Sequence, residues 1–329
     1  MTKVANLFKW VDPKTGEVLK VDGDSLVGGS GRKVPKEAGV YRFCGASSYA
    51  DTFGFQWNTF PKTQYDSSRC SDLTRKRFFA SCGWTPEEMA RKSVLEIGCG
   101  AGRFTEIILG ATNAFLCSVD YSSAVLANSA AHSNNQRLQV VQASVYELPF
   151  EEESFDYVFC FGVLQHTPDP KKTLECLARM VKGGGKIAVD FYPRSGWWTK
   201  WHAKYLFRKI VKRYENERLL KLIDKHLAWM LPLGLILLRL KIYPVFGRLL
   251  PIVDLSIYKK LKLSNKEFKQ WVLLDTFDML SPEYDQPQKA SEVKNELEKN
   301  GIKIEFSGKV FYGDNLVSNV VRGIKLASK

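Results

Sequence analysis

Three glycines at alternate positions end a short apolar run in the stretch SVLEIGCGAGRF, residues 93–104. They are Gly98, Gly100 and Gly102, and the helical pattern FTEIIL follows them. Glycines in a strand-to-helix turn let the backbone approach a ligand closely, and the start of the helix offers unpaired amides. The dinucleotide fingerprint needs its third glycine where this chain has Arg103, and no GK[ST] is present. The loop therefore predicts a ligand site. Its sequence disfavours NAD or FAD as the ligand, and it is not that of a phosphate-binding P-loop.

His166 is the histidine best placed to move a proton. Of the four histidines, it alone sits in the loop that leaves an apolar strand pattern, FDYVFCFG. Ligands bind at that carboxyl end in parallel sheets, and an imidazole there can deprotonate a hydroxyl near neutral pH. The same side chain could instead cap the next helix or pack against a ligand. The sequence leaves both interpretations open.

The elements that would position these residues alternate between strand and helix patterns from Ser93 to Tyr192. The runs VLEIG and YVFCFG are apolar throughout, as expected of strands that are buried on both faces. This alternation predicts an α/β fold with a parallel sheet covered by helices on both sides.

Five stretches in order resemble the motifs of class I S-adenosylmethionine-dependent methyltransferases. They are EIGCGAG, FLCSVD, LQVVQASVYELPF, FDYVFCFGVLQHTPDP and MVKGGGKIAV. The segments FGFQWNTFPKTQYDS and DTFDMLSPEYDQP also resemble features of methyltransferase type 11-like enzymes of bacterial glycan or specialised-metabolite pathways. The resemblance implies a doubly wound, mostly parallel seven-stranded sheet of Rossmann-like type, interrupted here by a helical insertion.

The resemblance also implies S-adenosylmethionine as cofactor and assigns residues to it. The expected cofactor contacts are Glu96, Gly98, Gly100, Gly102, Asp120, Tyr121, Ser144 and Phe161. Asp120 ends a strand, where a carboxylate can accept both ribose hydroxyls. Ser144 stands where family members usually have Asp, which predicts a weaker bond to the adenine amine.

Residues outside these motifs are expected on the acceptor side of the site. Tyr65, Tyr192, Tyr284 and Asp285 are the candidates for binding the acceptor, although SPEYDQP could equally be a surface turn. The aromatic residues between Phe53 and Tyr65 predict either a lid over the cofactor or a local core.

Four parts follow from these patterns. They are an N-terminal segment at 1–92, a cofactor-binding core at 93–193, a basic and apolar helical insertion at 194–270, and a C-terminal part at 271–329 that completes the sheet. The N-terminal segment has the outline of a zinc ribbon but no cysteine pair, and the seven cysteines are scattered. We therefore expect no metal, and the cysteine usage together with an N-terminus that lacks a secretory signal predicts a cytoplasmic protein.

The insertion carries the whole charge excess of the chain. Between residues 194 and 270 there are 18 basic and 5 acidic residues, a net charge of +13, which equals that of the full chain. Trp197, Trp198 and Trp201 lie beside a ridge expected from Lys200, Lys204, Arg208 and Lys212, and LAWMLPLGLILL is too short to span a bilayer.

This pattern predicts a helix at an anionic membrane surface or a cap over a lipid-like substrate. Helices that dimerise, giving a homo-oligomer, or that pack on the core are the alternative. Nucleic acid is disfavoured, because the long aliphatic runs have no evident use on RNA.

These observations predict methyl transfer to an oxygen, with nitrogen less favoured, of a small or lipid-linked acceptor such as a sugar or specialised metabolite. An inactive cofactor-binding scaffold or regulator and an RNA methyltransferase are the alternatives. The expected location is the cytoplasm, with peripheral contact at the inner face of the membrane.

Overall fold

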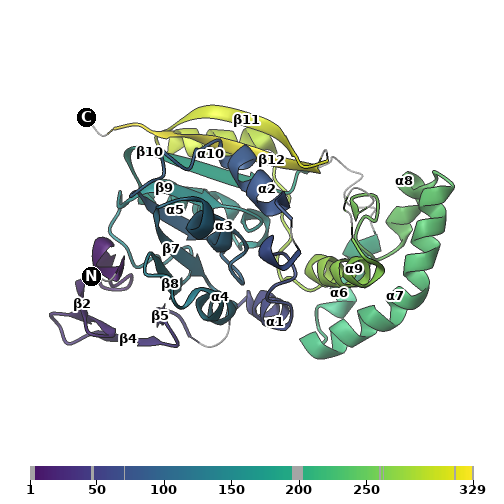
Figure 1. The fold of residues 1–329 in the computed structure, drawn as a ribbon, viewed down its shortest axis with the longest axis horizontal. Coiled ribbons are helices and arrows are strands. Elements are labelled where there is room, and N and C mark those ends of the chain that lie inside the picture. Colours follow the sequence, from purple (N-terminus) through teal and green to yellow (C-terminus); the bar gives the residue numbers. More distant parts are fainter. Residues whose placement is uncertain are drawn as a thin grey trace. The chain divides into compact units, whose positions relative to one another are not determined.

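The computed structural model describes residues 4–45, 48–69, 71–194, 203–258, 261, 263–314 and 316–327. The chain divides into two compact units (Figure 1). The first comprises Met1–Pro193, Tyr284–Gly313 and Val317–Lys329, and the second comprises Arg194–Glu283 and Asp314–Leu316.

The first unit is built on one sheet. Its strands are β1 (Trp10–Val11), β2 (Val18–Asp22), β3 (Ser25–Gly28), β4 (Lys33–Glu37), β5 (Val40–Arg42), β6 (Ser93–Ile97), β7 (Phe115–Asp120), β8 (Leu138–Gln142), β9 (Phe155–Cys160), β10 (Val181–Phe191), β11 (Ile302–Tyr312) and β12 (Leu316–Lys325). Their order is β1-β2-β3-β4-β5-β8-β7-β6-β9-β10-β12-β11. Strands β5, β8, β7, β6, β9 and β10 are parallel to their neighbours within this series, and β12 is antiparallel to β10.

The sheet differs from the seven-stranded expectation because the N-terminal segment joins it. The seven strands from β6 to β12 occupy one continuous part of the order, and five more strands are added beyond β8. Strands β1 to β5 form an antiparallel meander, and β5 then pairs in parallel with β8 through Val40, Tyr41 and Arg42. The ribbon-like segment thus covers an edge of the sheet.

Helices of the first unit pack on both faces of the sheet. They are η1 (Val4–Leu7), α1 (Asp51–Thr59), η2 (Ser67–Arg69), α2 (Leu73–Cys82), α3 (Arg103–Ala111), α4 (Val125–His132), η3 (Leu164–His166), α5 (Pro170–Met180) and α10 (Ala290–Lys299). Along β6, Val94 packs with side chains of α2, α3 and α4, whereas Leu95 packs in the cluster that contains residues of α5 and α10. This two-sided burial explains the continuous apolar strand runs.

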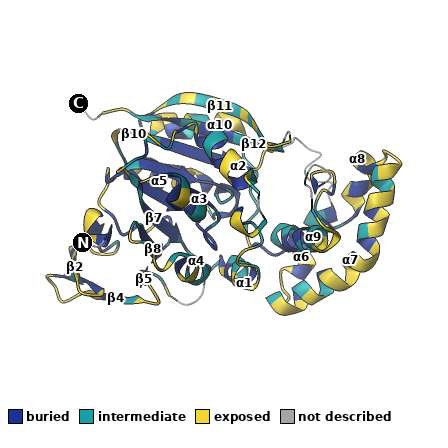
Figure 2. Ribbon diagram, viewed as in Figure 1, coloured by how far each residue is buried: buried dark blue, intermediate teal, exposed yellow. Residues whose placement is uncertain are grey.

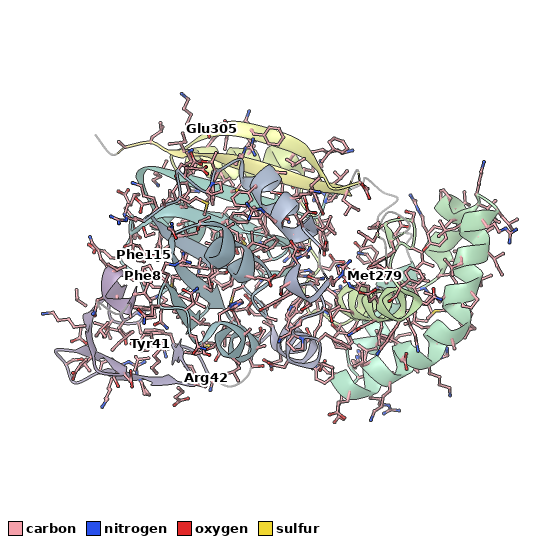
Figure 3. The ribbon with its side chains drawn as sticks, viewed as in Figure 1. Phe8, Tyr41, Arg42, Phe115, Met279 and Glu305 are labelled. Carbon is pink, nitrogen blue, oxygen red and sulfur yellow. The ribbon has the colours of Figure 1, made fainter. Side chains whose placement is uncertain are left out.

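An aromatic cluster anchors the meander to the rest of the sheet. The ring of Trp10 lies 5.3 Å from that of Tyr41 and 5.0 Å from that of Phe150, and its indole nitrogen donates to the carbonyl of Ala5. Phe8 joins the same cluster, and both Phe8 and Tyr41 can be located in Figure 3.

The second unit is helical. It contains α6 (Ala203–Val211), α7 (Asn216–Arg239), α8 (Tyr243–Phe246), η5 (Gly247–Leu249) and α9 (Asn265–Leu280). One stripe of α7 is buried, through Leu219, Ile223, Leu227, Met230 and Gly234, at the spacing of one helix face. The sequence-based boundary at residue 270 falls inside α9, and the compact unit continues to Glu283.

The exposed basic ridge expected for this unit is only partly present in the described residues. Arg208 is not part of an exposed ridge: it is buried, and its guanidinium donates to the carbonyls of Met279 and Pro282, at 3.1 and 2.6 Å. Trp197, Trp198, Trp201 and Lys200 lie outside the described residues. No helix in the described part of the chain is long and apolar enough to cross a membrane.

Candidate active site

The glycine loop joins β6 to α3 in a conformation that requires glycine. Gly98, Gly100 and Gly102 all have positive φ, at 78°, 51° and 99°. A Cβ at Gly98 would lie 2.0 Å from a methyl carbon of Val163, and one at Gly102 would lie 2.5 Å from the amide oxygen of Asn128. Both the turn and the close packing around it therefore exclude larger residues.

Asp120, at the end of β7, holds this loop in place. One of its carboxylate oxygens accepts from the amide of Gly100 at 2.8 Å. The other accepts from the amide and hydroxyl of Ser122, at 2.8 and 2.7 Å. The carboxylate thus lies at the carboxyl edge of the sheet, beside the loop, where the sequence predicts a ribose contact.

Glu96 lies inside the unit rather than at its edge. Its Oε2 accepts from the hydroxyls of Thr105 and Ser118, both at 2.6 Å, which ties β6 to α3 and β7. Burial raises the pKa of this carboxyl to about 7 despite these two bonds. Glu96 therefore helps to hold the glycine loop in place, because it lies on β6, before that loop in the chain, and bonds to α3, directly after the loop, and to β7. A direct contact of Glu96 with the cofactor stays a prediction.

His166 ends η3, just beyond β9, and is buried. Its Nδ1 lies 3.0 Å from the carbonyl oxygen of Tyr284. Because a carbonyl only accepts, the proton of a neutral imidazole is on Nδ1, and Nε2 carries the lone pair. The ring lies 5.0 Å from that of Phe53 and 5.7 Å from that of Tyr192.

The segment after Tyr284 is hydrogen-bonded to the loop that carries His166. The backbone amide of Gln286 donates to the carbonyl of Gln165 at 2.8 Å, and the side-chain amide of Gln286 donates to the carbonyls of Thr167 and Pro168. The structure therefore brings the predicted acceptor-side residues Tyr192 and Tyr284 to His166, and half-buried Asp285 follows directly in the chain. Gln286 was not predicted, since nothing in SPEYDQP distinguishes it from a turn residue.

Helix α1 covers this edge of the sheet and links its parts. Phe53 packs on His166, the ring of Trp57 lies 3.3 Å from the position of a Cβ on Gly100, and the Asn58 amide donates to the Ser123 carbonyl and hydroxyl. Just before α1, Tyr49 lies with its ring 5.1 Å from that of Tyr121 and 5.6 Å from that of Tyr284. The aromatic segment therefore packs on this edge of the sheet, and its action as a lid over the cofactor stays a prediction.

Tyr65 differs from its expected position, and for Phe161 and Ser144 the structure shows structural contacts while their cofactor contacts stay predictions. Tyr65 is not on the acceptor side: it is buried against the glycine loop, where its hydroxyl donates to the Ala101 carbonyl. Phe161 is buried in an aromatic cluster with Phe78 and Phe104. The Ser144 hydroxyl accepts from the amide of Tyr146 at 3.2 Å and so shapes the turn after β8.

Comparison with known proteins identifies one domain within the first unit. Residues 95–189 match the family model described as a methyltransferase domain. The core is a methyltransferase domain. The prediction of the S-adenosylmethionine-dependent class is thereby confirmed for this domain, and with it the cofactor.

Curated relatives match about a third of the chain. A ubiquinone biosynthesis O-methyltransferase of Pseudomonas putida is 34% identical over 112 residues, which are 32% of this chain and 47% of that protein. Its counterpart in Pseudomonas fluorescens is 33% identical over the same shares. The chain thus spans about half the length of the curated relatives that it matches.

Solved structures similar to this chain include magnesium protoporphyrin IX methyltransferase from Synechocystis PCC 6803, with bound SAH. It is 15% identical, with a TM-score of 0.44, and the match covers 84% of this chain and 96% of that one.

The residues at the edge of the sheet fit a cofactor of this class. The glycine loop allows close approach, α3 begins directly after it, and the Asp120 carboxylate lies beside it. The amide side chain of Gln56 on α1 is buried, and neither of its polar atoms is bonded to another described residue. An orphaned buried group of this kind is expected where a polar ligand belongs.

Proposed function

We propose that this protein transfers a methyl group from S-adenosylmethionine to a hydroxyl oxygen of a small or lipid-linked acceptor. The observation that carries the choice of oxygen is the hydrogen bond from His166 Nδ1 to the Tyr284 carbonyl. It directs the basic Nε2 lone pair away from that partner, as a general base requires. An alcohol or phenol must lose its proton to become a good nucleophile, whereas a neutral amine need not.

The cofactor supplies an electrophilic methyl group, and the chain supplies position and a base. The residues that would hold the cofactor are the glycine loop and Asp120. His166 would remove the acceptor's hydroxyl proton at Nε2, and the Tyr284 carbonyl would stabilise the resulting imidazolium through Nδ1. Phe53 and Tyr192 flank the imidazole and would exclude water from the reacting groups.

The names of the curated relatives support an oxygen acceptor, because they are O-methyltransferases of ubiquinone biosynthesis. The aromatic rings of Tyr49, Tyr192 and Tyr284 near His166 suit an acceptor with an apolar or ring-shaped body. A lipid-linked acceptor also agrees with the apolar second unit.

We further propose that the second unit contacts an anionic membrane from the cytoplasmic side. Apolar side chains that include Trp229 and Ile236 are exposed on α7, and Leu240, Val245 and Leu249 are exposed further along the chain. Figure 2 shows the exposed residues along α7. The same segment has a net charge of +13 between residues 194 and 270, which would attract acidic headgroups.

The first test is His166→Ala, assayed for methyl transfer to a panel of phenolic and alcoholic acceptors and for binding of S-adenosylhomocysteine. Loss of a general base is expected to lower turnover by about 10²- to 10⁴-fold, while the affinity for S-adenosylhomocysteine stays within about twofold. His226→Ala, at a histidine of the second unit, is the control and should retain turnover. Turnover that is unchanged in His166→Ala would remove His166 as the base.

A further inference from the structure

Gln56 is a buried amide without hydrogen bonds in the cover of the site. Its side chain is 1% exposed, and neither Oε1 nor Nε2 has a partner among the described residues. The hydroxyl of Thr52, one helical turn earlier on α1, likewise lacks a partner there. Native proteins bury few such groups, so each needs a ligand or a trapped water to explain it.

The position of Gln56 on α1 points to a ligand between the helix and the sheet edge. Residues three or four apart lie on one side of a helix, so Gln56 shares the covered side of α1 with Phe53. Phe53 packs on His166, and Trp57 packs on the glycine loop at Gly100. The amide therefore lies on the side of α1 that covers both the loop and the proposed base.

The chemical structure of the cofactor indicates which of its parts α1 would bind. This step rests on the proposed function. The sulfonium sulfur bears an adenosyl group, the methyl group and an amino-acid chain. Asp120 is the candidate for the ribose and Ser144 is the candidate for the adenine amine, and the methyl group must point to the acceptor beside His166. The amino-acid end is then the part left to meet the cover, and it is a zwitterion.

A glutamine amide suits a zwitterion, because its nitrogen donates to a carboxylate and its oxygen accepts from an ammonium. We propose that Gln56 binds the amino-acid end of S-adenosylmethionine, with the Thr52 hydroxyl as a second contact. Helix α1 is then a binding element for the cofactor as well as its cover.

The test compares two ligands that differ in this part alone. S-adenosylhomocysteine has the amino-acid end, and 5′-methylthioadenosine lacks it. In Gln56→Leu, calorimetry should show S-adenosylhomocysteine bound roughly 10- to 100-fold more weakly, as expected for a lost bond to a charged group. Binding of 5′-methylthioadenosine should change by less than about twofold, since no such bond is lost. Thr52→Val should show the same selectivity with a smaller loss.

A second readout separates a binding role from a structural one. Gln56→Leu removes an unpaired buried amide, so the ligand-free variant should melt at a higher temperature than the wild type. The matched control is Gln139→Leu, because Gln139 is also buried but its amide is paired with Lys36 and the Val140 carbonyl, at 3.0 and 2.7 Å. That variant should melt lower and bind both ligands as the wild type does.

Three outcomes would count against the assignment. Equal weakening of both ligands would mean that Gln56 only holds α1 in place. Unchanged binding of both ligands would mean that trapped water satisfies the amide. A rise in the KM of the acceptor alone would assign Gln56 to the acceptor. If the wild-type protein bound neither ligand, the proposed function itself would fail.

Discussion

At the scale of single residues, Glu96 shows how a motif position can act through other groups. The sequence places it two residues before the first glycine of the loop, and this spacing led us to expect a cofactor contact. The structure buries it and bonds it to hydroxyls of α3 and β7. Spacing along a strand cannot reveal this, because it does not say which neighbouring strands and helices bring hydroxyls to the carboxyl group.

The shifted pKa of Glu96 predicts a pH-dependent stability. Its pKa is about 7 in the folded protein against 4.5 for an ordinary Glu. The folded state therefore binds this proton more tightly, so the contribution of the carboxyl to stability is complete below pH 4.5 and is lost as the pH rises through 7. Glu96→Gln should raise the free energy of unfolding by up to roughly 3 kcal/mol at alkaline pH and have little effect in acid.

Urea unfolding at several pH values would measure this difference. Glu151→Gln is the control, because Glu151 is exposed and its substitution should have the same small effect on the free energy of unfolding at every pH. A Glu96→Gln variant that is less stable than the wild type at every pH would contradict the prediction.

At the scale of elements, the glycine spacing and the alternation of strands and helices predicted the core well. Strands β6 to β10 and helices α3 and α5 follow the predicted patterns, because two-sided burial leaves a plain apolar signal. The N-terminal segment was expected to have the outline of a ribbon, but the pairing of β5 with β8 was not predicted, since the strands of this segment are short and alternate with glycine turns. The side of the site on which Tyr65 lies could not be predicted either, because it depends on how residues 60–69 pack on α3, where Gln64 and Asp66 bond to Arg103 and Glu106.

Substitution by Ala should have opposite effects on stability at two glycines, Gly98 in the loop and Gly110 in α3. Gly98→Ala should lower the free energy of unfolding by about 2–5 kcal/mol, from a strained positive φ together with overpacking against Val163, and abolish cofactor binding. Gly110→Ala, in α3, has open space around its Cβ position and should gain about 0.5–1 kcal/mol. Urea unfolding of both variants checks this. A stable Gly98→Ala variant that binds cofactor would show that the loop has no need of glycine there.

At the scale of the whole molecule, charge and apolar exposure are concentrated in one of the two units. The composition predicted this concentration correctly, because charge can be counted along the chain. The composition did not predict which side chains would be exposed. Arg208, counted in the predicted ridge, is in fact buried, and its guanidinium is bonded to two backbone carbonyls. That depends on the packing of α6 with α9, which the periodicity of α6 alone does not fix.

The membrane proposal predicts salt-sensitive binding to anionic vesicles. In flotation assays the wild type should bind phosphatidylglycerol vesicles, bind neutral phosphatidylcholine vesicles weakly, and be partly released at about 0.5 M salt, where charges are screened. The double variant Val245→Asp/Leu249→Asp should lose binding, because both exposed side chains become charged. Val18→Asp, at an exposed valine of β2 in the other unit, should bind normally. Binding that ignores both salt and the double variant would refute the proposal.

The parallel pairing of β5 with β8 has a consequence for biosynthesis. Residues 40–42 leave the ribosome about a hundred residues before their partners at 140–142. Strand β8 in turn is held by β7, and β7 by β6. The N-terminal segment must therefore wait, with Trp10 lacking its contact with Phe150 and Tyr41 lacking its pairing with β8, until the nascent chain has supplied three later strands. Translation speed between residues 43 and 142 then sets how long these aromatic side chains are available to chaperones.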